Sequence, residues 1–379
     1  MRRNKGKIER FLTTLRAKNT KSTYRAGILD FLDFINEIER TDRINDLEGY
    51  ERLADDYLRA DRNYCNDIIE YLDSKEDRPS KTVNVYLAGW KEFLYYYDIE
   101  FSKKEQRLMK RKGRRSRTAT KDTILTPEML YRICDHTNEL GKTLFLFLSS
   151  SGCRIGEALT LEKDDIAWTK PVKILIRGDH TKNQKDRYTF ITDEAADHLR
   201  IWLDNRDDYI RSSANRHWAL VEHEIAPPKE APEKDNRVFP FSRQTAYWIW
   251  GSAVRKAGLK EIAETNRMTL TFHSLRRYFR TRLTGQLEES VIEMLMGHEG
   301  YLRDSYLRLT PEQIGEQYLK VEEALQMSSV EAISSRLRRI EDENAELRSM
   351  LNEIIIMFDL KERYGYKESL QRNLRKLNL

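Results

Sequence analysis

Cysteine is scarce in this 379-residue chain, and several common functional motifs are missing. The three cysteines, Cys65, Cys134 and Cys153, are odd in number and lack metal-ligand spacing, so we interpret them as reduced thiols of a cytoplasmic protein. Without an HExxH or CxxC motif, we expect no metal and no cofactor. The absence of a P-loop, a GxGxxG fingerprint and a GxSxG elbow argues against nucleotide hydrolysis and Ser/His/Asp chemistry.

Long hydrophobic runs are also missing. The first residues hold no apolar segment of roughly 7–15 residues, so we expect no signal peptide. No stretch of about 18 apolar residues occurs, so we expect no membrane partner. Neither sign of charge dominates, because 67 basic residues face 62 acidic ones and leave a net charge of +5. A chain of this length with 39% hydrophobic and 10% aromatic residues predicts a globular protein of two or three domains.

Helical periodicity runs through most of the chain. Two amphipathic segments within 6–38 and further ones at 51–73 and 81–97 predict a four-helix unit. A second unit begins at ILTPEML, where we expect Thr126 to cap a helix whose first residue is Pro127. The same periodicity predicts later helices at 142–152, 193–204, 242–257, 273–284, 288–296 and 311–325.

One segment alternates instead. Residues 173–192 place apolar and polar side chains in turn on both sides of a polar, basic tip, which predicts a β-hairpin. The predicted fold class is therefore mainly α with a small β-sheet, an α+β fold. We divide the chain into a helical N-terminal domain at 1–112, a linker at 113–123, a domain carrying the candidate site at 124–327 and a helical tail at 328–379.

The segment 101–122 concentrates positive charge. From Lys103 to Asp122, ten basic residues stand against two acidic ones, a local charge of +8. A solvated linker is one interpretation; a strap along DNA phosphates is the other, since such a strap gains affinity by releasing condensed counterions. We favour the strap. The expected DNA-contacting residues are Lys110, Arg111, Lys112, Arg114, Arg115 and Arg117.

The tail has a heptad pattern. Apolar residues from Val330 to Phe358 are separated by alternating steps of three and four, and Asn344 takes one of the seam positions. An unbroken 3.5-residue period predicts a coiled coil, and a buried Asn favours a parallel pair in register. A single amphipathic helix that folds back on its own domain is the alternative; we favour self-association.

The candidate site is a set of cationic and hydrogen-bonding groups. Arg154 opens the stretch RIGEAL, and Lys182 lies at the hairpin tip with Lys185 as a rival. His273 and Arg276 are three residues apart on one helix, so they share a face. Each of these residues could alone be an ordinary surface or core residue; their order and spacing together carry the prediction. The set is completed by His298 and the tyrosines that follow it, Tyr301, Tyr306 and Tyr318.

These residue types suit attack on a phosphodiester. The charged oxygens of a pentacoordinate phosphate are met by the planar fork of arginine. A lysine on a hairpin can protonate the leaving 5′ oxygen, and a histidine can act as a base. A tyrosine can form the phosphate ester, and the ester keeps the bond energy, so no metal or energy source is needed.

With these residues, the chain resembles the tyrosine recombinase (phage integrase) family, in an archaeal-type branch. The matching stretches are SGCRIGEALTL, TKNQKDRYTFIT, HSLRRYFRTRL and MGH, and two N-terminal stretches resemble the family's helical core-binding domain. The resemblance covers residues 6–325. It implies that the two domains close around duplex DNA.

The resemblance also implies a role for each site residue. Arg154 and Arg276 would clamp the scissile phosphate, and Lys182 would protonate the 5′ oxygen. His273 would assist proton transfer at the tyrosine, while His298 would bind the phosphate. Glu157 would orient Arg154 from behind the site. The family tyrosine usually follows the GH histidine by nine residues, but position 307 is Leu, so we choose Tyr306, with Tyr318 second and Tyr301 third. This shift leaves open whether the tyrosine attacks in its own site or a neighbour's.

The sequence thus predicts a site-specific recombinase that cuts and rejoins DNA through a 3′-phosphotyrosine, for integration, excision or related recombination. The implied partners are double-stranded DNA with inverted sites and further copies of the chain, as a dimer on one site and a tetramer in synapsis. Two alternatives remain: DNA relaxation of the type IB topoisomerase kind, and a non-catalytic DNA-binding regulator with the same fold.

Overall fold

The computed structural model divides into two compact units, Met1–Ala119 (unit 1) and Thr120–Leu379 (unit 2). At 180 and 217–222 only the backbone is described. No helix within the described part of the chain is long and apolar enough to cross a membrane. The structure describes residues 5–39, 47–113, 123–181, 184–222, 235–261, 268–297, 309–327 and 344–351.

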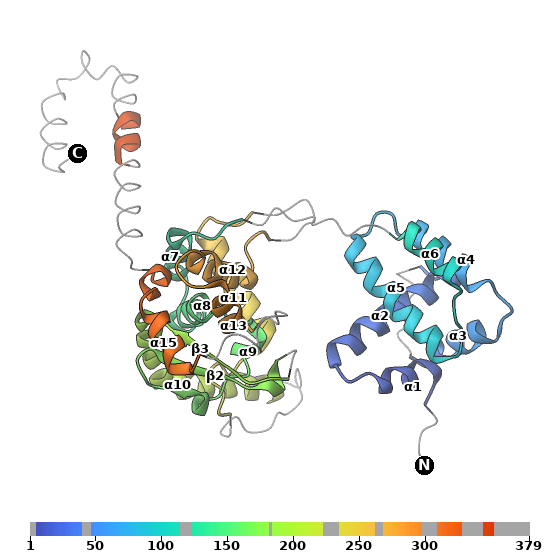
Figure 1. Ribbon diagram of the computed structural model, residues 1–379, viewed down its shortest axis with the longest axis horizontal. Helices are drawn as coiled ribbons and strands as arrows, with labels where there is room; N and C mark the ends of the chain where they lie inside the picture. Colours follow the sequence, from blue (N-terminus) through green and yellow to red (C-terminus); the bar gives the residue numbers. More distant parts are fainter. Residues whose placement is uncertain are drawn as a thin grey trace, which may run out of the picture. The chain divides into compact units, whose positions relative to one another are not determined.

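Unit 1 is entirely helical where it is described, and Figure 1 shows its helices wrapped around α2 and α5. The stacked rings of Phe31 and Trp90, 4.1 Å apart, lie at the centre of its core. The helices are α1 (Lys7–Thr14), α2 (Lys18–Ile35), α3 (Leu47–Arg59), α4 (Tyr64–Ser74), α5 (Ser80–Tyr96) and α6 (Lys103–Lys112).

Two expectations for unit 1 were wrong. The segment 51–73 is not one helix, because the Asn63 side chain accepts a hydrogen bond from the backbone N–H of Asn66 at 3.1 Å and starts a new helix, α4. The basic segment does not begin as a strap, because Ser102 and Glu105 form a capping box that starts α6. Met109, 2% exposed, buries one side of α6 in the core, and α6 contacts α4.

The crossing of α2 and α5 allows no side chain at two positions. A Cβ on Gly27 would lie 2.8 Å from the Cα of Tyr86, and one on Gly89 would lie 2.9 Å from the Cα of Tyr24. Because the obstacles are backbone atoms, the helices would have to separate.

Gly27→Ala is therefore expected to destabilise unit 1 by roughly 1–3 kcal/mol, as overpacking does. Gly251→Ala is the matched control, because its Cβ would find only the Met268 sulfur at 3.9 Å and alanine favours a helix interior by about 0.5–1 kcal/mol. Urea unfolding of both variants tests this opposition in sign. A Gly27→Ala protein as stable as wild type would contradict the tight crossing.

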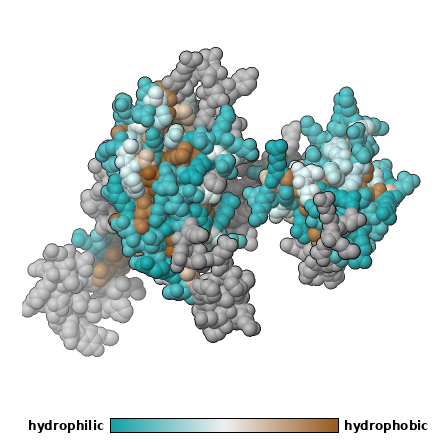
Figure 2. Space-filling model, turned by 90° about the horizontal axis from the view of Figure 1, so that it is seen from below, coloured by the Kyte–Doolittle hydropathy of each residue, from teal (hydrophilic) through white to brown (hydrophobic). Residues whose placement is uncertain are grey.

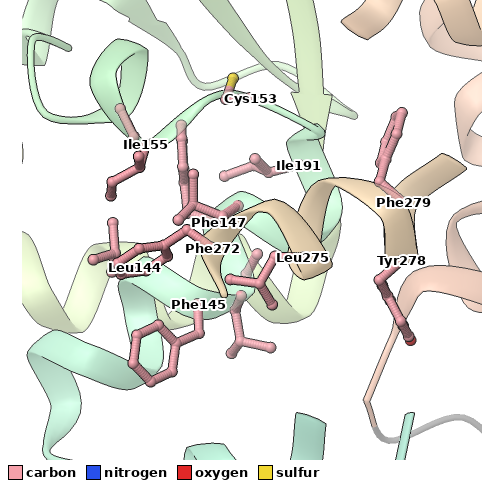
Figure 3. Close-up of a cluster of buried hydrophobic side chains, with 14 of the residues drawn as sticks. Leu144, Phe145, Phe147, Cys153, Ile155, Ile191, Phe272, Leu275, Tyr278 and Phe279 are labelled. Carbon is pink, nitrogen blue, oxygen red and sulfur yellow. The ribbon is translucent and has the colours of Figure 1, made fainter. Parts of the chain in front are cut away.

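Unit 2 is built around α8 (Glu139–Ser151), which is buried along nearly its whole length. Figure 3 shows Phe145 and Phe147 of α8 beside Phe272 and Leu275 of α12 (Phe272–Leu283). The other helices are α7 (Pro127–Asp135), α9 (Ile155–Ala158), α10 (Asp193–Glu222), α11 (Arg243–Lys256), α13 (Glu289–Met296) and α15 (Pro311–Leu319), with 3-10 turns η1 (Lys163–Asp165), η2 (Gly178–His180) and η4 (Glu322–Leu325).

The helix starts of unit 2 follow local capping chemistry. Thr126 accepts a hydrogen bond from the N–H of Met129 at 3.2 Å, and Pro127 is the first residue of α7, so this predicted helix start is confirmed. Two predicted helix ends were wrong. The helix expected at 193–204 continues as α10 to Glu222, and the one expected at 311–325 ends at Leu319 before η4.

The predicted hairpin is confirmed. Strands β2 (Val172–Ile176) and β3 (Arg187–Ile191) pair antiparallel, with Val172 opposite Ile191. A third strand, β1 (Ile166–Ala167), pairs antiparallel with β2 and was not predicted, because two residues carry too little alternation. Helices α8, α13 and α15 contact β3. The sheet thus links α8 to the end of α13.

The described surface is mainly polar. Figure 2 shows a largely hydrophilic face on both units, broken by small hydrophobic patches. Cys65, Cys134 and Cys153 are free and buried, as reduced thiols would be. Of the predicted coiled coil, only 344–351 is described; it is helical, and its seam residue Leu347 is 57% exposed.

Candidate active site

A glycine turn positions Arg154. The C-cap of α8 is Gly152 in the left-handed conformation, with φ 64°, and a Cβ there would lie 2.6 Å from the ring of Phe279. The turn stops α8 and leads through the buried Cys153 to Arg154, the N-cap of α9. The Arg154 side chain is 41% exposed, so its guanidinium reaches the surface at the end of a buried helix.

Glu157 holds Arg154 from inside the protein. Its carboxylate is 4% exposed and accepts hydrogen bonds from the Arg154 backbone N–H at 2.8 Å and from Arg154 Nη1 at 2.9 Å. Burial alone would raise the pKa of Glu157, but hydrogen bonds and charge from Arg187, together with bonds from Arg154, outweigh burial and lower it. Glu157 is therefore ionised at neutral pH and holds both the backbone of Arg154 and one nitrogen of its guanidinium.

This ionisation makes the stability of unit 2 depend on pH. Because the folded-state pKa of Glu157 lies below its ordinary value of 4.5, the stabilisation is fully present above pH 4.5 and is lost as the pH falls through the lowered value. We expect Glu157→Gln to cost roughly 1–3 kcal/mol at pH 7 and to weaken the fall of Tm in acid. Tm measured from pH 3 to 7 tests this, with Glu316→Gln on the exposed face of α15 as control. Identical pH profiles for Glu157→Gln and wild type would contradict it.

Arg276 approaches the same turn from α12. It is 2% exposed, and its two terminal nitrogens donate to the carbonyl of Gly152 at 2.5 Å and to the carbonyl of Met296 at 2.6 Å. These carbonyls lie at the C-terminal ends of α8 and α13, where the helix dipole favours a cation. Burial, and then the positive charge of Arg154, lower the pKa of Arg276 to about 10, so it stays charged at neutral pH. One candidate arginine therefore binds the turn that carries the other.

His273 lies one helical turn before Arg276 and is exposed. Its neighbours Phe272 and Leu275 are buried against α8 (Figure 3), and this packing sets the rotation of α12. Arg276 therefore faces inward while His273 lies at the surface.

The remaining candidates are placed as follows. Gly297, directly after the helix predicted at 288–296, is left-handed with φ 71° and is the C-cap of α13, so the predicted end of this helix is confirmed. Lys185 is exposed on the hairpin. Lys182, His298, Tyr301 and Tyr306 lie outside the described residues.

Tyr318, the second choice for the nucleophile, is a core residue. Its ring is fully buried beside Phe190, and its hydroxyl donates to the Ser150 carbonyl at 2.9 Å. Burial raises the pKa of Tyr318 well above 10. The phenol of Tyr318 is therefore part of the core that supports α8, and its buried hydroxyl is not accessible to a phosphodiester.

Sequence reasoning missed one charged residue of this region. Arg187, the first residue of β3, is 8% exposed and donates to both oxygens of Glu157, from Nη2 at 2.7 Å and from Nη1 at 3.3 Å. The available signal was a charged residue at a hairpin position whose side chain faces inward.

In unit 1, three of the six residues expected to contact DNA lie on α6. Lys110, Arg111 and Lys112 are exposed, and Lys112 pairs with Asp73 at 2.8 Å. A groove of about 590 Å³ runs between α5 and α6. Four of its lining residues are basic, namely Lys91, Lys103, Arg107 and Lys110. Arg114, Arg115 and Arg117 lie outside the described residues.

No cluster of three or more His, Cys, Asp or Glu side chains in the described ranges is arranged to hold a metal ion. The guanidinium groups of Arg154 and Arg276 are two cations that can bind and stabilise negative charge on a group placed beside them.

Residues 123–301 match the model of the phage integrase family. This segment, just under half of the chain, belongs to that family. The matched residues include Arg154, Lys182, His273, Arg276 and His298, and they end before Tyr306.

Two archaeal relatives of this family are tyrosine recombinases named XerA. The protein from Thermococcus kodakarensis is 28% identical over 45% of this chain and 50% of its own length, so the match spans half of that relative. The protein from Saccharolobus solfataricus is 24% identical over 79% of this chain and 86% of its own length.

A solved structure of a lambda integrase dimer bound to a core site shares the fold. Its TM-score is 0.50 at 12% identity, over 80% of this chain and 98% of that one. The helical N-terminal region and the domain with a small antiparallel sheet thus share the fold of that integrase. The predicted family and its helical architecture are confirmed.

Proposed function

We propose that this tyrosine recombinase homologue cuts and rejoins DNA at specific sites through a 3′-phosphotyrosine intermediate. One observation carries the proposal: Arg276 binds the Gly152 carbonyl, two residues before Arg154, so two arginines from distant segments converge on one turn. Arg276 is buried with its positive charge close enough to Arg154 to feel that charge, and the burial of a charge costs free energy. An anion bound between the two guanidiniums would offset their repulsion.

The reaction follows from the residues. Arg154 and Arg276 bind the two non-bridging oxygens of the scissile phosphate and stabilise the charge that grows there in the transition state. Tyr306 attacks phosphorus through its phenolic oxygen, with His273 taking the phenol proton. The bond to the 5′ oxygen breaks, Lys182 supplies the proton to that oxygen, and His298 donates a hydrogen bond to the phosphate. Glu157 keeps Arg154 in position, and the reverse sequence rejoins the strands.

The proposed partner is double-stranded DNA with inverted recognition sites. The basic face of α6, with Lys110 and Arg111 exposed, supports contact with the phosphate backbone, and we extend it to the linker residues Arg114, Arg115 and Arg117. A dimer on one site and a tetramer in synapsis are proposed by analogy with the lambda integrase, whose structure is a dimer on a core site. The tail seam that includes Asn344 and Leu347 would pair two copies.

A nicked suicide substrate tests the proposal. It carries an inverted site whose short 5′ fragment diffuses away after cleavage, so the protein stays covalently bound to the 3′ phosphate. Wild-type protein is expected to form this adduct and, with a partner strand, to join the two. Protein that binds the site but traps no DNA would point to the regulator, and relaxation of supercoiled DNA by strictly monomeric protein would point to the topoisomerase kind.

A further inference from the structure

Arg187 connects parts of unit 2 that are far apart in sequence. From the first position of β3, its Nη atoms bind both oxygens of Glu157 on α9, and its Nε donates to the Leu295 carbonyl at the end of α13 at 3.2 Å. With an exposed fraction of 8%, the side chain is buried between these partners. Three segments therefore meet on one guanidinium.

The end of α13 is shaped around this side chain. A Cβ on Gly297 would lie 2.8 Å from Arg187 Nε and 2.9 Å from its Cζ. The Gly297 turn therefore lies directly on the guanidinium, and the next residue in the chain is His298. Arg187 and Arg276 bind the successive carbonyls of Leu295 and Met296, so both hold the same helix end.

The bonds to Glu157 divide unequally between its two arginines. Arg187 is buried and engages both carboxylate oxygens, whereas the Arg154 side chain engages one through Nη1 and is 41% exposed. A guanidinium has five N–H donors, so Arg154 keeps donors for another acceptor. Without Arg187, the buried carboxylate would depend on Arg154 and would draw it inward, because an unpaired buried charge is costly.

We propose that Arg187 is a positioning residue of the strand-cleavage site, which holds Glu157 and the end of α13 so that Arg154 keeps its exposed donors for the scissile phosphate. This inference rests on the proposed function. The planar fork is essential to it, because a lysine ammonium is a point charge that cannot span both carboxylate oxygens and the Leu295 carbonyl in one plane.

The test measures three quantities for full-length variants: the single-turnover rate of adduct formation on the suicide substrate, the Kd for the same DNA, and Tm. Arg187→Met is expected to cleave about 10–100-fold more slowly at unchanged Kd, the usual range for a residue that orients a reacting group. Arg187→Lys is expected to lose at least about tenfold in rate and to stay folded.

Arg206→Met is the matched control. Arg206 lies on α10 and is also buried, with an exposed fraction of 2%. Its guanidinium donates to the backbone carbonyls of Asp235 and Arg237. We expect it to lower Tm about as much as Arg187→Met does. It should leave the cleavage rate of the folded protein within about twofold of wild type, since it orients no site residue.

A double-mutant cycle with Glu157→Gln separates positioning from general loss of structure. If Arg187 acts through Glu157, the double variant cleaves about as slowly as the slower single variant. Should Arg187→Met fail to fold, Arg187→Lys replaces it in the cycle. The inference is overturned by a wild-type rate in either Arg187 variant, or by rate losses that multiply in the double variant. Wild-type protein that traps no DNA overturns the proposed function itself, and this inference with it.

Discussion

Tyr306→Phe is expected to abolish the covalent protein–DNA adduct, with a loss of at least about 10⁴-fold that takes trapping below detection. Phenylalanine keeps the ring but has no oxygen to form the phosphate ester, and no other group can replace a covalent nucleophile. DNA affinity should stay within about twofold of wild type, because the variant leaves the proposed phosphate contacts of the arginines and of α6 unchanged. Denaturing gels of the suicide-substrate reaction measure the adduct, and gel shifts measure binding.

Tyr318→Phe is the matched control. Its hydroxyl makes one buried hydrogen bond, to the Ser150 carbonyl, so the expected effect is a stability loss of about 1 kcal/mol with trapping retained. Tyr301→Phe should likewise keep the adduct. Mass spectrometry of the trapped peptide identifies the esterified residue directly. An adduct in Tyr306→Phe, or its loss in Tyr318→Phe or Tyr301→Phe, would assign the nucleophile differently.

Arg154→Met and Arg276→Met are each expected to slow cleavage by roughly 10²–10³-fold. Each variant removes a fixed cation from the oxygens that gain charge in the transition state, and loss of one such donor has an effect of this size. Methionine fills most of the side-chain volume, so neither variant leaves a large cavity. Single-turnover rates at saturating DNA measure the effect. A loss below about tenfold in either variant would remove that arginine from the phosphate site.

The same two variants should differ in stability. Arg276 is 2% exposed, and Arg276→Met would leave the carbonyls of Gly152 and Met296 buried without this partner, at a cost of roughly 2–4 kcal/mol. The Arg154 side chain is 41% exposed, and Glu157 would keep Arg187 as its partner, so about 1 kcal/mol or less is expected. Urea unfolding of both proteins measures the difference. Equal stability losses would contradict the different burial of the two guanidiniums.

Local chemistry in the sequence was enough for the helix starts and the hairpin. Thr126 caps α7 as predicted, because an N-cap needs only a side chain and the N–H groups two or three residues on. The helix predicted at 288–296 ends at Gly297, whose left-handed turn is equally local. The same rules, applied to Asn63 and Ser102, predict the starts of α4 and α6. The capping box SKKE borders a strongly basic run, so the same residues carry both a helix-start signal and a charge pattern typical of a linker.

The candidate site was predictable as a set of residue types, and the segment 123–301 that matches the phage integrase family contains most of them. The hydrogen bonds that connect the residues of the site were not predictable from the sequence. Nothing near Arg276 in the sequence predicts that it binds the Gly152 carbonyl, 124 residues earlier, or that Arg187 binds Glu157 across 30 residues. Tyr318 was the second candidate for the nucleophile, because its separation from His298 along the chain does not reveal that its side chain is buried.

The amino-acid sequence alone thus established the helical character, the hairpin and the cationic groups available for phosphate chemistry, because periodicity, caps and residue types act over a few neighbours. Tertiary structure decided which of these cations meet, which tyrosine is buried and which arginine supports another. Those outcomes depend on the packing of α12 and α13 against α8 and β3, and segments brought together by packing leave no local trace in the chain.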